Sequence, residues 1–496
     1  MKKRIFAILL AAMLTAPMLF SCAGETADET TADAGAGGEN AAVDAETEPG
    51  WQYPDVDYQG GEYRILNFDQ LWNMYIHMDA AEQTGEPLND AVYNRNRTVE
   101  EALNCKIVEK NLECDSANTV TMLTDEAKTT IMAGEDEYDI MCLPVEKNLS
   151  LITEGYMMDL MAIDGLELQE TWWDQFIIDA VTLDGKLYFV SGAANLMAFD
   201  SMWALFFNED IMADHNLEKP YDLVREGKWT LDALMEYCSA VANLNGDDNF
   251  KWNKDGNAFY GISLHDSGAP EKFLFSADVH YAEAQGDDIV FTLSGDHTYA
   301  IFDKLASFLN QDMGLALKGH TTDFDADLGG YMHAFTAERT MFLSAEIKAA
   351  QLMRDMESTY GMVPFPKADE AQDNYRTTIV STMLYWCIPT TNTNLDMTAT
   401  VSEVLTHDSY VNVIPTYYDS VVEHKGLRNE DSIEMLEIMR QTKGVEIAAV
   451  FGWNASLSAN IRTKLYAGDS QVASTIASAQ PSFEADIAKF KEFLAD

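Results

Sequence analysis

An alternation of strand and helix patterns early in the chain most constrains how it can fold. The alternating residues Glu62–Phe68 predict a strand, and a helix pattern with apolar side chains at helical spacing follows over Leu88–Leu103. A second strand at Cys105–Glu109, a helix over Val120–Ala133 and a buried strand over Tyr138–Pro144 complete the series. Because strands and helices alternate one by one, we expect a parallel sheet covered by helices, which is an α/β fold.

This topology also predicts where a ligand would bind. Open parallel sheets hold ligands in the crevice beyond the carboxyl ends of their strands. Asn67, Phe68 and Asp69 end the first predicted strand, Trp72 follows shortly after, and Glu146 follows the third. We therefore expect these five residues to face a ligand.

A second set of elements begins near Trp203. The apolar run Trp203–Asp210 predicts a strand, and Thr230 is a suitable N-cap for a helix over Leu231–Val241. Further strand patterns lie at Thr340–Leu343, Tyr360–Pro366 and Ile379–Ile388. The last hundred residues are mainly helical in pattern. With 47% hydrophobic residues in a chain of 496, there is enough apolar material for at least two domains.

The first residues have the pattern of a bacterial lipoprotein signal. Basic residues at positions 2–4 precede the apolar stretch Ile5–Phe20, which is too short and too interrupted to span a membrane comfortably. Leu19-Phe20-Ser21-Cys22 resembles a lipobox, so we expect residues 1–21 to be removed and Cys22 to carry a lipid. An unmodified thiol beyond an ordinary cleavage site is the alternative. Residues 22–50, rich in Ala, Gly, Thr and acids, then form a flexible tether.

The charge of the chain excludes some partners. The whole chain carries 32 Lys and Arg against 82 Asp and Glu, and loss of the three basic leader residues leaves a net charge of −53. Nucleic acids and anionic membrane surfaces both need a basic face, so neither is an expected partner. Beyond Cys22, five cysteines remain with no CxxC pair, and buried free thiols are the default interpretation. Cys105 and Cys114 are close enough in sequence to bridge a local turn, and their pairing stays open.

The residues from Trp203 to Asp232 resemble the extracellular solute-binding proteins of ATP-driven importers, of the family that includes maltose-binding receptors. The resemblance rests on an aromatic-Asn-acid strand, a following loop and a Trp-Thr helix start: Phe207-Asn208-Glu209-Asp210, Pro220-Tyr221-Asp222 and Lys228-Trp229-Thr230. Segments elsewhere fit the same family, at Glu82–Glu86, Leu88–Tyr93, Tyr138–Ile140, Asp184–Tyr188 and Gly361–Lys367.

This resemblance implies a type II periplasmic-binding-protein fold, with two α/β lobes joined by a hinge and a ligand trapped between them. The implied lobes comprise residues 51–202 with 370–428 and residues 203–369 with 429–496. It further implies a monomeric, non-enzymatic receptor without a cofactor, lipid-anchored to the outer face of the cell membrane. Such a receptor would pass a solute to the permease subunits of an ABC importer, and the expected solute is a sugar or oligosaccharide.

Sugar sites combine aromatic platforms with polar side chains that form directed hydrogen bonds. We expect Trp172-Trp173-Asp174 to supply both, on the premise that two adjacent tryptophans cannot both face one core; core packing is the alternative. Trp203 lies at the implied crossing between lobes. Further candidates are placed by local sequence alone, namely Glu346 after a strand, Tyr417 after Pro415 and Trp453 after a glycine.

Two alternative functions stay open on the sequence. One is an exported glycoside hydrolase, which needs two suitably spaced carboxylates. With 82 acidic residues in the chain, some pair could always meet this spacing, so the acids neither support nor exclude an enzyme. A peptide or oligosaccharide capture lipoprotein without a transporter would use the same fold. The Asn243–Asn249 run places oxygens at alternate positions as calcium loops do, but it lacks the required glycine and glutamate, so a solvated turn is preferred and no metal site is predicted.

Overall fold

The computed structural model describes residues 51–69, 77–113, 119–286, 288–319, 330–380, 383–422 and 430–495. The contacts divide the chain into two units, Met1–Glu46 and Thr47–Asp496. The first unit, with the predicted leader, Cys22 and most of the tether, lies outside the described residues, as do Trp72 and Cys114. None of the helices in the described ranges is long and apolar enough to cross a membrane.

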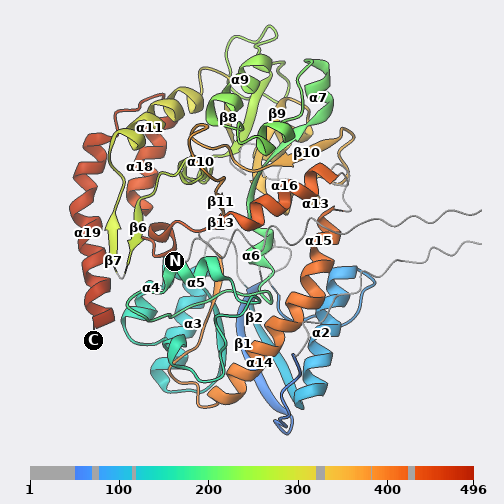
Figure 1. The fold of residues 1–496 in the computed structure, drawn as a ribbon, viewed down its shortest axis with the longest axis vertical. Helices are drawn as coiled ribbons and strands as arrows, with labels where there is room; N and C mark the ends of the chain where they lie inside the picture. The colour runs from blue at the N-terminus through green and yellow to red at the C-terminus, as the bar shows by residue number, and fades with distance from the viewer. Residues whose placement is uncertain are drawn as a thin grey trace, which may run out of the picture. The chain divides into compact units, whose positions relative to one another are not determined.

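The first sheet contains four strands in the order β12–β3–β1–β2, of which β1 and β2 are labelled in Figure 1. Their bounds are Gly61–Asp69 for β1, Cys105–Glu113 for β2, Ile140–Pro144 for β3 and Leu384–Cys387 for β12. β1 runs parallel to both β2 and β3, whereas β12 is antiparallel to β3. The predicted parallel strand-helix alternation is therefore confirmed, and a distant segment adds an antiparallel strand at its edge.

The first two helices of this region form where the sequence placed them, and the shorter helices that follow were not predicted. They are α2 (Pro87–Leu103), α3 (Thr119–Ala133), α4 (Val145–Thr153), α5 (Gln175–Val181) and α6 (Met197–Asp200), with a short 3-10 turn at Leu160–Ala162. Glu86 caps α2 by accepting a hydrogen bond from the Asn89 backbone, and Leu88, Val92 and Val99 are buried along its inner face. Helix α2 packs beside α14 (Leu395–Asp408), so segments about 300 residues apart lie side by side (Figure 1).

The second sheet has five strands in the order β10–β4–β9–β5–β8. Their bounds are Trp203–Asn208 for β4, Tyr260–His265 for β5, Ala316–Gly319 for β8, Thr340–Glu346 for β9 and Tyr360–Val363 for β10. β4 is antiparallel to β9 and β10, while β5 runs parallel to β8 and β9. The amino end of β4 and the carboxyl ends of β5 and β9 consequently share one edge.

Local capping fixes the helices around this sheet. Thr230 caps α9 (Leu231–Val241), as predicted, by accepting a hydrogen bond of 3.3 Å from the Ala233 backbone. The predicted strand at Trp203–Asp210 is two residues too long, because Asn208 accepts hydrogen bonds from the next backbone N–H groups and starts α7 (Glu209–Asp214). The other helices are α8 (Tyr221–Arg225), α10 (Ala269–Ser276), α11 (Asp296–Leu309), α12 (Gly330–Thr336) and α13 (Ala349–Leu352).

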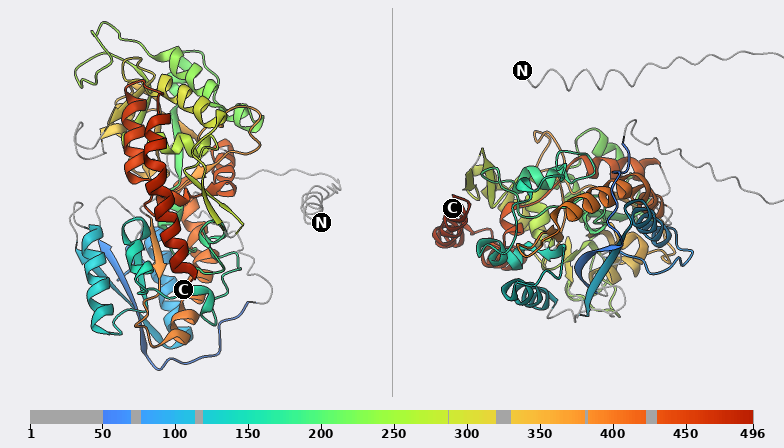
Figure 2. Two further views of the ribbon diagram at one scale, coloured as in Figure 1. Left: turned by 90° about the vertical axis from the view of Figure 1, so that its left-hand side faces the viewer. Right: turned by 90° about the horizontal axis from the view of Figure 1, so that it is seen from below.

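The carboxyl-terminal part is mainly helical, as expected. Its elements are a π-helical turn at Ser409–Val413, then α15 (Ile414–Val422), α16 (Glu430–Gln441), α17 (Ile447–Val450), α18 (Ala455–Tyr466) and α19 (Ala473–Ala495). Helices α18 and α19 lie side by side, which both views of Figure 2 show. Two small sheets pair β6 (Ala282–Gln285) with β7 (Asp288–Phe291) and β11 (Thr377–Thr378) with β13 (Lys443–Gly444). The lobe boundaries inferred from the sequence stay a prediction.

Four cysteines carry free, buried thiols: Cys105, Cys142, Cys238 and Cys387. This confirms the default interpretation for those four. Asp247, in the Asn243–Asn249 run with oxygens at alternate positions, accepts hydrogen bonds from the backbone N–H groups of Asn257 and Ala258, both at 2.7 Å. Its carboxylate therefore closes a turn, as the preferred interpretation requires.

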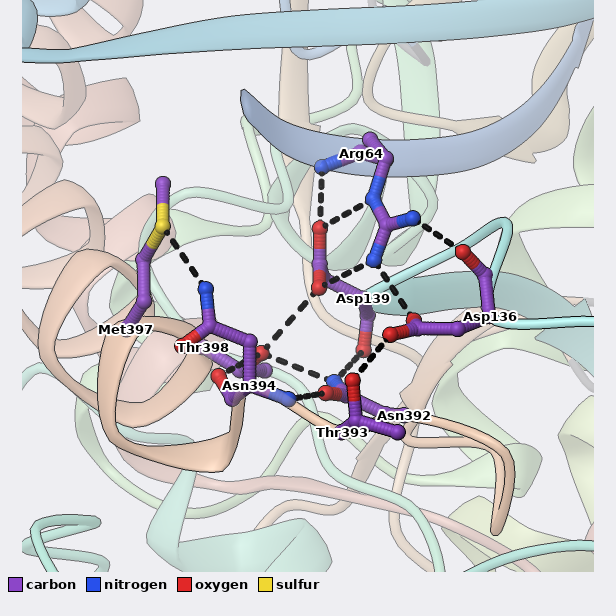
Figure 3. Close-up of polar contacts among 8 residues, drawn as sticks. All are labelled: Arg64, Asp136, Asp139, Asn392, Thr393, Asn394, Met397 and Thr398. Atoms are coloured by element: carbon purple, nitrogen blue, oxygen red, sulfur yellow. Dashed lines mark hydrogen bonds and ion pairs between the residues drawn. The ribbon is translucent and has the colours of Figure 1, made fainter. Parts of the chain in front are cut away.

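A polar network ties the first sheet to α14 at the amino end of β3 (Figure 3). The Arg64 guanidinium donates to both carboxylate oxygens of Asp139, at 3.0 and 2.9 Å, and to Asp136 at 2.7 Å. Asn392 donates to the Asp139 carbonyl at 3.1 Å and to Thr398 at 2.8 Å. We call these residues the basal network; its members are Arg64, Asp136, Asp139, Asn392, Thr393 and Thr398.

Candidate functional site

The shared edge of the second sheet gathers aromatic and charged side chains. Trp203, the first residue of β4, pairs in register with Glu346, the last residue of β9. The ammonium of Lys272, on α10 just beyond β5, lies 5.4 Å from the centre of the Trp203 ring. Lys348 Nζ lies 3.4 Å from Glu346. The antiparallel pairing of β4 with β9 thus brings two of the predicted site residues, Trp203 and Glu346, together.

A residue from the first sheet's side faces this edge. Glu146 opens α4 directly after β3, and its charge acts on both Lys272 and Glu271. The neighbouring turn packs closely enough that a side chain on Gly452 would meet the Glu146 carbonyl at 2.4 Å. With φ of +72°, that position suits glycine on both counts. We call the following residues the edge cluster: Glu146, Trp203, Glu271, Lys272, Glu346 and Lys348.

Trp203, Lys272 and Lys348 of the edge cluster are buried, whereas its three glutamates are partly exposed. Trp203 is 3% exposed, yet its indole N–H has no hydrogen-bond partner among the described residues. His265 stands edge-on to the Trp203 ring, with 6.2 Å between ring centres. Because buried polar groups are normally hydrogen-bonded, an unpartnered indole N–H marks a place where a ligand acceptor would be favourable.

A small cavity of about 20 Å³ adjoins the cluster, between α10, α17 and the segment after β11. Its lining includes Lys272, Glu271, Tyr281, Ile379, Glu446 and Asn454. The buried Tyr281 hydroxyl in this lining also has no partner among the described residues. A volume of this size has room for about one water molecule, so a sugar enters only if the surrounding elements separate.

Burial shapes the ionisation of these groups. Burial lowers the pKa of Lys272, an effect opposed by the charges of Glu271, Glu346 and Glu146. Burial likewise raises the pKa of Glu271. Next to the cluster, burial raises the pKa of Asp200 to about 7, although Lys348 and a hydrogen bond from Tyr417 act to lower it. The Tyr417 hydroxyl donates to Asp200 Oδ1 at 3.0 Å, so the predicted site residue Tyr417 is engaged by a protein carboxylate next to the cluster.

Trp172, Trp173 and Asp174 are committed to contacts within the protein. Both tryptophans are buried, at 7% and 2% exposed, and both indole N–H groups donate to Glu403, at 2.7 and 2.8 Å. The premise that adjacent tryptophans cannot share one core is therefore wrong, because one carboxylate accepts from both rings. Asp174 caps α5 and forms an ion pair of 2.5 Å with Lys443. Their ligand role stays a prediction.

The remaining sequence candidates are scattered. Asn67 is buried and donates to Glu109 at 2.6 Å, and Phe68 is 3% exposed in the core. The Asp69 side chain and Trp72 lie outside what the structure describes. Trp453 is half-buried and stacked on Phe451, with 4.7 Å between ring centres. These residues do not join the edge cluster through any contact among the described ranges.

The sequence reading missed Lys272, Glu271, Lys348 and Asp200. One available signal was the apolar stretch Tyr260–His265, which forms β5 and is followed by Gly268 and Pro270 at a helix start. That pattern places Glu271 and Lys272 in the first turn beyond a strand's carboxyl end. Among the described residues, no group of three or more His, Cys, Asp or Glu is arranged to hold a metal ion.

Comparison with known proteins identifies the fold. No model of a protein family and no curated protein matches the chain. Among solved structures, a sugar transporter component of Rhizobium etli in an open conformation is similar, with a TM-score of 0.56, 14% identity and coverage of 86% of this chain and 99% of that one.

Two further similar structures hold bound sugars. One is an ABC substrate-binding protein of Listeria monocytogenes in complex with cycloalternan, at a TM-score of 0.53 and 14% identity, covering 86% of this chain and 99% of that one. The other is the maltose/maltodextrin-binding domain of Bdellovibrio bacteriovorus bound to maltotriose, at 0.53 and 12% identity, covering 86% and 100%. The chain therefore has the type II fold of these sugar-binding proteins, which confirms the fold prediction and, at the level of the fold, the family resemblance.

Proposed function

We propose that this chain is the extracellular receptor of an ABC importer, which captures a carbohydrate between its two lobes and does not transform it. The observation that carries the proposal is the edge cluster, where a buried tryptophan with an unpartnered N–H lies among carboxylates and ammonium groups at the edge of a sheet. Sheet edges of this kind are where α/β folds bind ligands.

The chemistry of the cluster suits a sugar. An indole ring offers a flat apolar surface to a pyranose face, while carboxylates and ammonium groups accept and donate hydrogen bonds to hydroxyls. Three of these groups, on Glu271, Lys272 and Glu346, lie around Trp203 within reach of one another's charge. The similar solved structures that hold cycloalternan or maltotriose support a carbohydrate as the ligand.

Capture would proceed by closure. A ligand favours the closed arrangement only through contacts that closure makes, so the residues that matter are those contributed from both sides. Glu146 would act from the α4 side, and Trp203 with Lys272 from the side of the second sheet. No covalent step is required, and the cluster needs no cofactor.

The proposal extends to the location and partners of the chain. Cys22 would carry a lipid that holds a monomeric receptor at the outer face of the cell membrane, near its permease subunits. The support is the leader pattern and the acidic tether in the sequence. Replacing Cys22 with Ala should release the protein from the membrane fraction and abolish incorporation of labelled fatty acid; retention with undiminished label would contradict the anchor.

A ligand screen tests the central proposal. The purified full chain is heated with mono- and oligosaccharides, peptides and amino acids, and candidate ligands are then titrated by calorimetry. A receptor is stabilised by RT ln(1 + [L]/Kd), or about 2.7 kcal/mol at a hundredfold excess over Kd, and the sugar is recovered unchanged. Released product would instead support a glycoside hydrolase. Stabilisation by peptides alone would contradict the choice of carbohydrate.

A genomic observation separates the receptor from a capture lipoprotein without a transporter. Two membrane permease genes next to this one, together with uptake of the same sugar by cells, would support import. Uptake that continues unchanged after deletion of the gene would contradict it.

A further inference from the structure

Lys272 differs from the other cations of the edge cluster in having no protein counter-ion in contact. It is 8% exposed, yet no hydrogen bond or ion pair to its Nζ atom is found within the described residues. Within the described residues its ammonium lies over the face of the Trp203 ring, 5.4 Å from the ring centre. A buried ammonium carries three N–H donors, and leaving them unmatched is costly unless something else supplies acceptors.

The carboxylates that act on Lys272 are each neutralised by a different cation. Their pairs are Glu146 with Lys147 at 3.0 Å, Glu271 with Arg462 at 4.0 Å, and Glu346 with Lys348 at 3.4 Å. A fourth carboxylate, that of Glu446 in the cavity lining, lies 3.2 Å from His280. Burial acts to lower the pKa of His280, but hydrogen bonds with Asp278 and Glu446 raise it to about 9, so this ring is a cation at neutral pH. With these carboxylates matched, Lys272 is the surplus positive charge.

The surroundings of Lys272 point toward a ligand and not toward a missing structural partner. Lys272 contributes to the lining of the 20 Å³ cavity, and so does Tyr281, whose hydroxyl is unpartnered within the described ranges. The unpartnered Trp203 N–H belongs to the ring that Lys272 overlies. Three buried donors therefore converge on one region, in a chain whose net charge is −50.

We propose that Lys272 is a specificity-determining residue which receives an anionic group of the captured carbohydrate, either a uronate carboxylate or a sulfate ester. A carboxylate or sulfate oxygen would supply charge-assisted acceptors to the ammonium, and the indole and phenol donors would complete its surroundings. The inference rests on the proposed function, since it names the class of sugar that the receptor takes. A neutral sugar would leave the Lys272 ammonium without a counter-charge, whereas an anionic sugar would supply one. The site would therefore bind the anionic sugar more tightly than the neutral one.

A comparison among ligands tests this inference without altering the protein. Calorimetry on the full chain would use four oligosaccharides of one length: a neutral one, one bearing a glucuronate, its uncharged methyl ester, and one bearing a sulfate ester. We expect a charged ligand to bind about 10- to 100-fold more tightly than the neutral one, the range for a hydrogen bond to a charged group. The methyl ester should lose this advantage, and the two charged ligands distinguish carboxylate from sulfate.

A matched pair of variants assigns the effect to Lys272. Lys272→Met keeps the length and apolar stem while removing the charge, and should weaken binding of the charged ligand about 10- to 100-fold and binding of the neutral sugar by a smaller factor. Lys304→Met is the control, because Lys304 pairs with Asp232 at 2.8 Å and belongs to no part of the cluster. It should leave both affinities unchanged. Thermal melting shows whether each variant is folded.

Each outcome bears on a distinct proposal. Equal or tighter binding of the neutral sugar by the unmodified chain overturns the inference about Lys272 but leaves the receptor proposal standing. Preference for the charged sugar that survives Lys272→Met overturns the assignment to this residue. Binding of no carbohydrate at all overturns the proposed function itself. If Lys272→Met does not fold, the methyl-ester comparison and loss of charged-ligand affinity between low and 0.5 M salt decide the question; a salt-independent affinity counts against the inference.

Discussion

The basal network and the edge cluster use similar side chains to different ends. In the basal network, the Arg64 guanidinium is fully engaged, and Asp139 is 2% exposed while it accepts from the Arg64 side chain and backbone. Around the edge cluster the ion pairs of Glu146, Glu346 and Glu271 measure 3.0, 3.4 and 4.0 Å, and buried donors on Trp203 and the adjoining Tyr281 lack partners within the described chain.

Under the proposed function, this difference separates a structural role from a binding role. A saturated network gains nothing from a further partner, so it stabilises the segments that it joins. An unsaturated cluster costs stability in the free protein and recovers it when acceptors arrive, which is how a site pre-organised for a ligand behaves. Trp173, with its N–H bonded to Glu403, belongs to the first type and Trp203 to the second.

The largest effect on stability is expected at Trp173. Trp173→Ala removes a side chain that is 2% exposed and packs edge-on against Trp386, so the unfolding free energy should fall by about 3–5 kcal/mol. Urea denaturation followed by circular dichroism measures it. Phe176→Ala, in the adjacent helix but 43% exposed, should cost under about 1 kcal/mol. If Trp173→Ala is as stable as the unmodified protein but loses sugar affinity, Trp173 has a binding role and not a structural one.

The basal network should respond nearly as strongly. Asp139→Asn leaves the Arg64 guanidinium with one carboxylate instead of two, and we expect the unfolding free energy to fall by about 3 kcal/mol. Asp222→Asn is the matched control, because the Asp222 side chain is 84% exposed in its ion pair with Arg225 and should contribute under about 0.5 kcal/mol. Sugar affinity should be unchanged in both variants. Equal losses of stability would remove the distinction between buried and exposed pairs.

Asp200 predicts a pH dependence beside the edge cluster. Its folded pKa of about 7 lies above the ordinary value of 3.8, so the folded state holds the extra proton. The favourable contribution is therefore fully present below about pH 4 and is lost as the pH rises through 7. Asp200→Asn should match the unmodified protein near pH 4 and be more stable by about 1–3 kcal/mol at pH 8, since burying an ionised carboxylate is avoided while Lys348 loses a partner.

Thermal melting over the range from pH 4 to 8 measures this difference. Other groups with raised pKa values titrate equally in both proteins, so the difference between the two stability curves reports on Asp200 alone. A constant gap across the whole pH range would contradict the prediction.

The smallest expected effect is on affinity at Trp203. Trp203→Ala should weaken sugar binding by more than about tenfold, equivalent to about 1.4 kcal/mol, because both the ring surface and the N–H donor are removed. Trp203→Phe retains a ring without the N–H donor, so its sugar affinity should lie between those of the unmodified protein and Trp203→Ala. Tryptophan fluorescence of the unmodified chain should change on binding. Unchanged affinity in both variants would take Trp203 out of the site while leaving the fold intact.

Local pattern was sufficient for many elements. The predicted helices over Leu88–Leu103 and Leu231–Val241 agree with α2 and α9 to within one residue, because N-caps and apolar spacing are encoded within a few positions. β5 was missed and the end of β4 was misplaced. At that end, the Asn208 side chain turns the backbone into α7, which the apolar pattern alone does not report.

The candidate site was predicted less well, for a physical reason. Trp203 and Glu346 were expected separately, and only strand pairing brings them opposite each other across 143 residues of sequence. The sequence favours Trp172 and Trp173 as a platform, because no residue near them in the sequence indicates that Glu403, about 230 residues away, accepts from both. The partners that satisfy or fail to satisfy a polar group come from distant segments.

The sequence by itself determined the α/β alternation, the acidic character and the lipoprotein-like leader pattern of the chain, since each is a property of composition or of neighbours within a few residues. Tertiary structure decided which tryptophan is saturated by hydrogen bonds and which is not, and which lysine lacks a counter-ion. Burial and hydrogen bonding depend on the folded surroundings of a residue, so the type of the residue alone does not determine them.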